Sequence, residues 1–288
     1  MQFVTLNNGI QMPMEGYGVF RIADAVQCKE AVYAAIRTGY RLIDTAAAYL
    51  NEVAVGRAIA RAIDEKIVTR QELFVTTKIW VQDMADEESA YKAVKTSLGK
   101  LKLDHVDLVL LHQPMNDYFA AYRGLERAYA EGLTRSIGVA NFYPEVLANF
   151  CGCVKVCPAV NQIEIHPFFA RAAAIADMQR YGVHPQAWGP LAEGQHGIFT
   201  DPLLTQIGSQ YGKTPAQVAL RWNVQRGVSV IPKSSRPERM AENLHIWDFA
   251  LTSEEIAQIS AKTLGRSTII NHRDPQLVRT LLGWKVHE

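Results

Sequence analysis

The stretch LFVTTKIWVQDMADEESAYKAVKTSLGKLKLDHVDLVLLH (residues 73–112) contains one complete strand–helix–strand unit. An apolar run (73–78) is followed by apolar residues at helical spacing (87–101), and a second apolar run (106–112) ends the unit. Such alternation is typical of parallel strands that are joined by crossover helices. The fold therefore depends on how often this unit recurs along the chain.

Apolar runs of this kind occur eight times. We predict strands at 15–19, 40–44, 73–78, 106–112, 134–140, 159–164, 183–188 and 228–232. Helical patterns lie between them, as at 24–39, and capping signals mark helix starts at TPAQ (214–217), SRPE (235–238) and TSEE (252–255). Eight units without a linker predict a single α/β domain over residues 1–288, a closed (β/α)8 TIM barrel. An open doubly wound sheet is the alternative.

Segments outside the eight units extend this plan. Two short β-like runs, FVTL and IQMP, flank the turn sequence NNG (7–9), which predicts an N-terminal β-hairpin over residues 1–14. We expect this hairpin to cover the N-terminal end of the barrel. Residues 194–213 and about 252–288 exceed what a bare barrel requires, so we expect them to form added helices and loops.

The composition is that of an ordinary globular protein, with 48% hydrophobic and 20% charged residues. The 30 basic and 29 acidic residues nearly cancel, so the chain has no net field that would attract nucleic acid or a membrane surface. No apolar run approaches the roughly eighteen residues of a membrane helix, and the N-terminus does not resemble a signal peptide. We therefore expect a cytoplasmic enzyme with a small-molecule substrate, and a monomer by default.

Three of the four cysteines lie close together in CGCVKVC (Cys151, Cys153 and Cys157). A metal or redox cluster is one interpretation, and half-buried thiols in a reducing compartment are the other. Zinc ribbons space their cysteines by two residues and need a second ligand pair, which this sequence lacks. We therefore predict no metal site, and we place Cys28 in the core because it lies in a helical pattern.

Polar or aromatic residues follow the carboxyl ends of seven predicted strands. They are Asp44, Lys78, His112, Asn141, Gln162, Trp188 and Lys233, with Tyr49 in the loop after Asp44. Each has an ordinary alternative, since such a lysine is usually solvated, an aspartate often caps a helix, and a histidine can be a core residue. In a (β/α)8 barrel, however, the loops at this end converge on the active site. Together these residues predict one catalytic constellation.

Asp44 and Tyr49 are separated by a run of alanines in RLIDTAAAYLNE (41–52). Tyrosine, with a pKa near ~10, is a poor acid at neutral pH. A lysine ammonium such as that of Lys78 would lower the tyrosine pKa, and a carboxylate would hold the lysine in place. His112 can donate a hydrogen bond to a substrate oxygen. Because no nucleophile or metal-ligand spacing is evident, a cofactor must supply the other half of the chemistry.

The segment IPKSSRPERMAEN (231–243) predicts a phosphate site. Lys233, Arg236 and Arg239 gather where a strand ends and a helix begins, and a helix N-terminus attracts phosphate through its free N–H groups and its dipole. This many cations exceed the need of a diphosphate and fit the additional phosphate of NADPH. Because GYGVFR (16–21) lacks the third glycine of a dinucleotide-binding turn, the cofactor would bind outside a Rossmann fold.

Seven motifs resemble those of the aldo-keto reductases, and especially of the bacterial branch that includes diketogluconate reductases. In family order they are LNNGIQMP, GYRLIDTAAAYLNEVAVG, VTTKIW, LVLLHQP, IGVANF, VNQIEIHP and VIPKSSRPERMAEN. They extend along nearly the whole chain, and their shared order is more specific than any single motif. The resemblance implies NADPH-dependent reduction of aldehydes or ketones to alcohols, with NADPH and NADP+ as the cofactor pair.

The resemblance also implies a role for individual residues. Tyr49 would be the general acid, Lys78 and Asp44 would lower its pKa, and His112 would orient the carbonyl. The implied cofactor residues are Val19, Asn141, Gln162, Trp188, Gly189, Leu191, Lys233, Ser234, Ser235, Arg236, Arg239 and Asn243. Of these, Asn141 and Gln162 would hold the nicotinamide carboxamide, and Trp188 would stack on the ring. The implied substrate residues are Phe20, Trp80 and His112.

Two positions depart from the family pattern, because Ala140 and Gly189 stand where many members have serine. Each change removes a hydroxyl near the cofactor, so we expect altered cofactor binding with the chemistry retained. One alternative function is an NADPH-binding sensor or regulatory subunit with little turnover. A hydrolase or isomerase that uses Asp44 and His112 is another, but it leaves the basic segment 231–243 unexplained.

Overall fold

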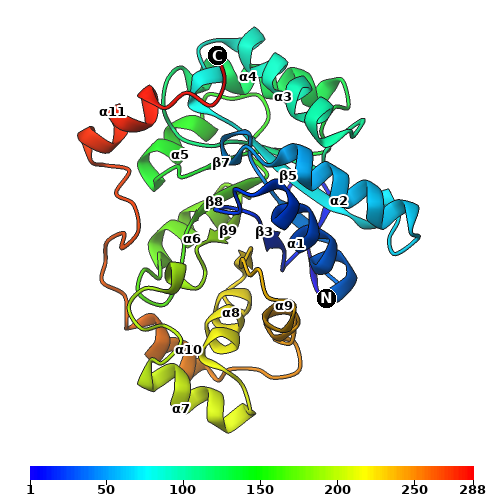
Figure 1. Cartoon of the computed structure of the whole chain (residues 1–288). Coiled ribbons are helices and arrows are strands. Elements are labelled where there is room, and N and C mark those ends of the chain that lie inside the picture. The colour runs from blue at the N-terminus through cyan, green and yellow to red at the C-terminus, as the bar shows by residue number, and fades with distance from the viewer.

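The computed structural model describes residues 1–288 and contains the predicted barrel (Figure 1). Eight parallel strands follow one another in the sheet in sequence order: β3 (Tyr17–Gly18), β4 (Leu42–Asp44), β5 (Phe74–Ile79), β6 (Leu108–Leu111), β7 (Ile137–Ala140), β8 (Val160–Glu164), β9 (His184–Trp188) and β10 (Ser229–Val230). Backbone hydrogen bonds from Gly16 N to Val230 O (2.8 Å) and from Gly18 N to Pro232 O (3.1 Å) join the first strand to the last. The sheet is therefore closed, and the open doubly wound alternative is wrong.

A helix follows each of the eight strands on the outside of the barrel. They are α1 (Ala25–Thr38), α2 (Glu52–Asp64), α3 (Glu87–Leu101), α4 (Tyr118–Ala130), α5 (Pro144–Cys151), α6 (Ala172–Arg180), α8 (Pro215–Gln225) and α9 (Pro237–Leu244). The ends of α1 illustrate why they form where they do. Asp24 caps its start by accepting a hydrogen bond from Gln27 N at 2.7 Å, and Gly39 ends it at φ 122°. The sequence pattern predicted this helix within one residue at each end.

One predicted helix cap is wrong. Thr214 and Thr252 form the capping boxes expected from TPAQ and TSEE, but Ser235 does not cap α9. That helix begins at Pro237, so Arg236 occupies the cap position and no side chain accepts a hydrogen bond there. Proline favours the first helical position. In SRPE an arginine separates the serine from the proline, which moves the helix start one residue away from Ser235.

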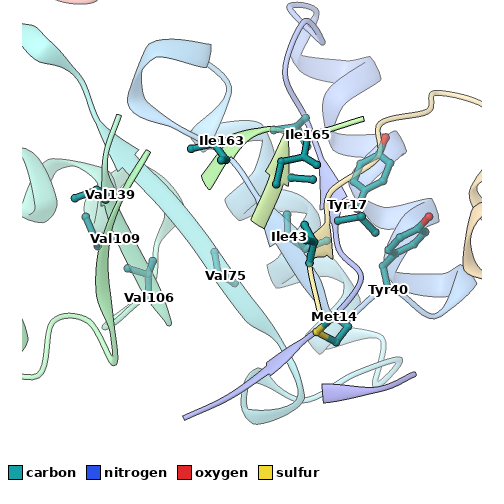
Figure 2. Close-up of a cluster of buried hydrophobic side chains, with 14 of the residues drawn as sticks. Met14, Tyr17, Tyr40, Ile43, Val75, Val106, Val109, Val139, Ile163 and Ile165 are labelled. Carbon is teal, nitrogen blue, oxygen red and sulfur yellow. The ribbon is translucent and has the colours of Figure 1, made fainter. Parts of the chain in front are cut away.

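Alternation along the strands divides the barrel side chains into two sets. Outward residues such as Ile43 pack against the helices in a cluster of 68 buried residues (Figure 2). Inward residues such as Leu42 and Phe74 form a smaller cluster of 10 buried residues. Later inward positions of the same two strands are polar, namely Asp44 and Lys78. The barrel interior is therefore apolar toward its N-terminal end and polar toward its C-terminal end.

The predicted N-terminal hairpin closes the apolar end. Strands β1 (Phe3–Thr5) and β2 (Gln11–Pro13) pair antiparallel around a turn with Gly9 at φ 84°. Met12 is fully buried in the inner cluster, and Asn7 Nδ2 donates a hydrogen bond to Pro158 O at 3.0 Å on the loop before β8. The predicted position of the hairpin is thus confirmed.

Further helical elements supplement the eight strands and their eight outer helices. They are the 3-10 turns η1 (Ala47–Tyr49), η2 (Arg70–Glu72), η3 (Val81–Asp83) and η4 (Ala192–Gly194), and the helices α7 (Pro202–Tyr211), α10 (Ser253–Ser260) and α11 (Pro275–Gly283). The chain after α10 passes along the outer edge of the molecule to α11 (Figure 1). Trp80 Nε1 then donates a hydrogen bond to Trp284 O at 2.8 Å, so the C-terminal segment returns to the loop after β5. No helix has both the length and the apolar character needed to cross a membrane.

Candidate active site

The structure brings the four predicted catalytic residues together at the carboxyl ends of neighbouring strands. Asp44 is the last residue of β4, Lys78 lies near the end of β5, and His112 directly follows β6. Tyr49 ends the turn η1, which follows β4. Because β4, β5 and β6 are adjacent in the sheet, residues that are far apart in the sequence meet at one mouth of the barrel.

Lys78 is the centre of a buried hydrogen-bonded group. Its ammonium donates to Asp44 Oδ1 at 2.5 Å, to Thr45 O at 3.0 Å and to Tyr49 Oη at 3.3 Å. An ammonium has three N–H donors, so these bonds use all of them. The Lys78 side chain is fully buried and that of Asp44 is 2% exposed, so little water screens the ion pair. Folding alone therefore fixes a cation beside the tyrosine hydroxyl.

The pKa values of this group differ in part from the sequence prediction. Burial raises the pKa of Tyr49 above its ordinary value of 10.0, Lys78 lowers it, and Asp44 raises it. The predicted net lowering is wrong, because the cost of burying a phenolate outweighs the attraction of the ammonium. Burial lowers the pKa of Lys78, but the negative charges of Asp44 and of the Tyr49 phenolate together raise it by more than burial lowers it. The net shift of the Lys78 pKa is therefore upward. At neutral pH the pair is a protonated tyrosine beside a lysine cation.

His112 lies beside Tyr49 and Trp80 in the site. Its ring meets those of Tyr49 and Trp80 edge-on, at centroid distances of 5.6 and 5.1 Å. Burial lowers the pKa of His112 well below 6.5, and the nearby Lys78 ammonium lowers it further. The imidazole is therefore neutral at neutral pH. A neutral imidazole carries one N–H, and Nδ1 has no hydrogen-bond partner within the protein.

The alanines of RLIDTAAAYLNE (41–52) allow the turn between Asp44 and Tyr49 to pack closely. Ala46, Ala47 and Ala48 are 0%, 8% and 5% exposed. Larger side chains at these buried positions would displace their neighbours, because a packed interior has no spare volume. The small residues thus let Tyr49 return to the Lys78 ammonium.

Gln162 on β8 extends the buried group across the barrel. Its Nε2 donates to Asp44 Oδ2 at 2.8 Å and to Gln186 Oε1 at 2.7 Å. Both amide hydrogens are therefore used, which leaves Gln162 Oε1 as an acceptor without a partner in the protein. Gln186 was not among the predicted site residues. It is an interior residue of β9 and belongs to no motif, so no local sequence signal marked it.

Asn141 joins the end of β7 to two other parts of the site. Its Nδ2 donates to His112 O at 3.0 Å, and its Oδ1 accepts a hydrogen bond from Trp188 Nε1 at 2.8 Å. The Asn141 backbone has φ 64°, in the left-handed region that asparagine tolerates better than most residues. This conformation turns the chain sharply after the strand and places the amide between the histidine and the tryptophan.

The predicted phosphate-binding residues lie on the exposed segment that runs from the end of β10 into the first turn of α9. Lys233, Ser235, Arg236 and Arg239 are exposed, and none of the three cations forms an ion pair with a carboxylate. Tyr17 Oη donates to Ser234 O at 2.5 Å, which anchors the segment to β3. The donors are cationic side chains at the start of a helix, a combination that fits a phosphate group.

Four further predicted cofactor residues lie near these groups in the fold. Val19 is buried after β3, and its backbone N–H donates to Asp44 O at 3.2 Å. Gly189, with φ 58°, and the half-buried Leu191 lie on the loop after β9, and Asn243 is buried in α9. The predicted residues thus come from the ends of β3 to β10 and converge on one side of the barrel.

A family model described as the aldo/keto reductase family matches residues 16–263. The chain belongs to the aldo/keto reductase family. The family predicted from the motifs is therefore confirmed, and the relatives described below include bacterial members.

This aldo/keto reductase is 41% identical over 276 residues to morphine 6-dehydrogenase of Pseudomonas putida, with 91% of each chain covered. It is 39% identical over 266 residues to methylglyoxal reductase DkgA of Escherichia coli (strain K12), which covers 91% of this chain and 94% of that protein. The crystal structure of a Bombyx mori aldo-keto reductase in complex with NADP superimposes with a TM-score of 0.89 at 36% identity. That match covers 93% of this chain and 95% of the other.

The two departures from the family pattern have different surroundings in this reductase. Ala140 is 1% exposed and belongs to the inner apolar cluster. Gly189 has φ 58°, and a Cβ atom there would approach Ile269 Cδ1 to 3.2 Å. A serine at position 189 would therefore meet both backbone strain and a close neighbour. Glycine in place of serine at position 189 is therefore consistent with the local backbone, which is in the left-handed region.

An ion pair across the barrel mouth was not predicted. Arg21 Nη1 lies 2.8 Å from Glu193 Oε2, which connects the loop after β3 to the loop after β9. Glu193 has φ 50°, so its backbone lies in the left-handed region. The two residues are 172 positions apart in the sequence, and neither belongs to a recognisable motif. No local signal could have paired them.

The predicted substrate residues differ in how accessible they are. Phe20 is 44% exposed and its ring lies 5.0 Å from that of Tyr49, whereas Trp80 is only 2% exposed. Trp284 covers Trp80, with 5.1 Å between the ring centroids. His287 Nε2 also lies 2.8 Å from Asp83 Oδ1, which holds the C-terminal end against η3. The C-terminal segment therefore forms one wall of the mouth, which the sequence indicated only in outline.

Proposed function

We propose that this reductase transfers a hydride from NADPH to the carbonyl carbon of aldehydes and ketones, with Tyr49 as the general acid. One observation carries the proposal, namely the buried chain from Tyr49 Oη to Lys78 Nζ (3.3 Å) and on to Asp44 Oδ1 (2.5 Å). Its relatives support it, because they include a methylglyoxal reductase, a glyoxal reductase and an aldo-keto reductase solved in complex with NADP.

NADPH would supply the hydride when bound, and the residues of this chain would supply the proton and hold the ligands. Tyr49 is protonated at neutral pH and can donate its proton as negative charge develops on the carbonyl oxygen. The Lys78 ammonium, held by Asp44, stabilises the phenolate that remains. A neutral His112 can donate a hydrogen bond that orients the carbonyl oxygen.

The donor set of this chain fits NADPH. Lys233, Arg236 and Arg239 are cations without an acidic partner at the start of α9, where they would bind the phosphate on the adenosine ribose. Gln162 Oε1 is a free acceptor for the carboxamide N–H group, while its own amide hydrogens are used within the protein. The Trp188 ring would stack on the nicotinamide.

The proposal is tested by following NADPH absorbance with methylglyoxal, glyoxal and a panel of larger aldehydes and ketones. For Tyr49→Phe we expect kcat to fall by about 10²- to 10⁴-fold, the usual range for loss of a general acid. NADPH binding, measured by tryptophan fluorescence, should stay within a few-fold of the parent. Tyr181→Phe, a change at a tyrosine that is 42% exposed, is the matched control and should leave both values unchanged.

Two other outcomes would contradict the proposal. Turnover near the parent level in Tyr49→Phe would show that Tyr49 is not the general acid. Tight NADPH binding without turnover of any carbonyl would favour a sensor or regulatory subunit instead.

We also propose that residues 1–288 form one domain. The hairpin bonds to the loop before β8 through Asn7, and the C-terminal segment bonds to the loop after β5 through Trp80. A single cooperative transition on heating, with the mass of one chain in solution, is the expected result.

A further inference from the structure

The cysteines of CGCVKVC take no part in the proposed reaction. Cys151 ends α5, and Cys157 lies on the loop that leads into β8. Helix α5 runs back from the carboxyl end of β7, so both cysteines lie at the N-terminal end of the barrel. The hairpin covers this end, where Asn7 Nδ2 bonds to Pro158 O. The cysteine segment is thus separated from Tyr49 by the length of the strands.

The sulfur atoms of Cys151 and Cys157 are in contact, with 3.7 Å between them. The loop that carries Cys157 is fixed by other groups, because Glu126 Oε1 on α4 accepts hydrogen bonds from Lys155 N and Val156 N, both at 2.9 Å. The two thiols are therefore held together by the backbone around them. Formation of a disulfide would shorten the distance between the sulfur atoms from 3.7 Å to about 2.05 Å.

The surroundings of the pair suit thiol chemistry. Both thiols are partly exposed, whereas Cys28 is fully buried. The neighbouring Cys151 thiol lowers the pKa of Cys157, and the thiolate is the nucleophilic form of cysteine. The chain contains no group of three or more His, Cys, Asp or Glu residues that could hold a metal ion. The arrangement is that of a dithiol and offers no ligand set for a metal.

We propose that Cys151 and Cys157 are a reversible modification site, which peroxides convert to an intramolecular disulfide. The Cys157 sulfur attacks one oxygen of hydrogen peroxide, the O–O bond breaks, and a sulfenic acid and one water are formed. The Cys151 sulfur then attacks the sulfenic sulfur, which forms the S–S bond and releases a second water. Two thiols are oxidised while one peroxide is reduced to two waters, and an added dithiol reverses the reaction.

The test uses the full-length protein treated with hydrogen peroxide and then alkylated. Trypsin cleaves after Lys155, which separates Cys157 (peptide 156–171) from Cys151 and Cys153 (peptide 136–155). We expect the free thiols to fall from four to two, and the two peptides to be joined through Cys151. A reducing agent should restore all four thiols.

Cys153→Ser is the deciding variant, because its peptide 136–155 retains only Cys151. We expect it to form the same linked peptides and to keep one free thiol, that of Cys28. If it keeps all its thiols after peroxide treatment, the proposal is overturned. A wild-type linkage that maps to Cys153 instead, or a linkage between two chains, overturns it as well. None of these measurements uses carbonyl reduction, so their failure is distinguishable from a failure of the proposed function.

Discussion

The two ends of the proposed ligand site are built in different ways. At the catalytic end, Lys78 is fully buried and all three of its N–H donors are bonded within the protein. At the β10–α9 end, Lys233, Arg236 and Arg239 are exposed and pair with no carboxylate. A buried ion pair is fixed by folding, whereas exposed cations acquire a strong partner only from a ligand. The difference indicates that folding alone positions the general acid. Cofactor affinity depends instead on exposed cations that gain an anionic partner only when a phosphate binds.

Removing the cation at the buried end should have the largest effect. Lys78→Met takes the ammonium away from Tyr49 and leaves Asp44 buried without a counter-ion. We expect kcat to fall by about 10²- to 10⁴-fold. The free energy of unfolding should fall by about 3–5 kcal/mol, since half of a buried pair is lost. Steady-state kinetics and urea unfolding measure the two effects.

The double variant Lys78→Met with Asp44→Asn separates catalysis from stability. It removes the unpaired charge, so much of the lost stability should return. Turnover should stay low, because the ammonium beside Tyr49 is still missing. Recovery of turnover together with stability would reduce Lys78 to a structural role.

Changes at the exposed end should act on cofactor affinity. Lys233→Ala and Arg239→Ala each remove one charge-assisted contact, so we expect NADPH to bind about 10- to 100-fold more weakly. The kcat at saturating NADPH should be retained, and NADH binding should change little because NADH lacks the phosphate. Lys66→Ala, a charge-matched change at an exposed lysine before β5, is the control for net charge in the fluorescence titration. Equal losses for NADH and NADPH would contradict the assignment.

A second buried carboxylate, that of Glu15, forms no ion pair and can be compared with Asp44, which pairs with Lys78. Glu15 is fully buried, its Oε2 accepts a hydrogen bond from Trp247 Nε1 at 3.1 Å, and its Oε1 has no partner. Burial raises its pKa from 4.5 to about 8, although Trp247 lowers it. Because the folded-state pKa is above the unfolded value, the stabilisation is complete below 4.5 and is lost as pH rises through about 8.

We therefore expect the wild type to lose about 1–3 kcal/mol of stability between about pH 6 and about pH 9, and Glu15→Gln to lose much less. Urea unfolding at the two pH values measures the difference. Glu254→Gln, at an exposed glutamate in α10, should keep the wild-type pH dependence. Parallel pH profiles for wild type and Glu15→Gln would show that another group is responsible.

The smallest effect is expected at the ion pair across the mouth. The Arg21 side chain is 69% exposed, so the pair with Glu193 contributes little energy. We expect Glu193→Gln to speed NADP+ release by about 2- to 5-fold in stopped-flow fluorescence. The exchange variant Arg21→Glu with Glu193→Arg should restore the parent rate. A rate unchanged in Glu193→Gln would mean that this contact does not slow release.

The sequence predicted the features that depend on local patterns. The eight strands, the hairpin around Gly9 and the residues at the strand ends follow from alternation, turn residues and the convergence of loops in a barrel. The ion pair of Arg21 with Glu193 and the cover of Trp284 over Trp80 depend on residues far apart in the sequence. They have no local signal.

The predicted direction of the Tyr49 pKa shift was wrong for a related reason. The predicted neighbour Lys78 is present, but the degree of burial, which decides the sign, is a property of the whole packed site.

The most direct test of the central claim measures two variants in one experiment. Tyr49→Phe and Arg239→Ala would each be assayed for the single-turnover rate at saturating NADPH and for the NADPH dissociation constant. We predict that Tyr49→Phe loses the rate and keeps the affinity, while Arg239→Ala loses the affinity and keeps the rate. If rate and affinity fall together in both variants, the catalytic end and the β10–α9 end of the site are not independent. That result would contradict the claim that folding alone positions the general acid.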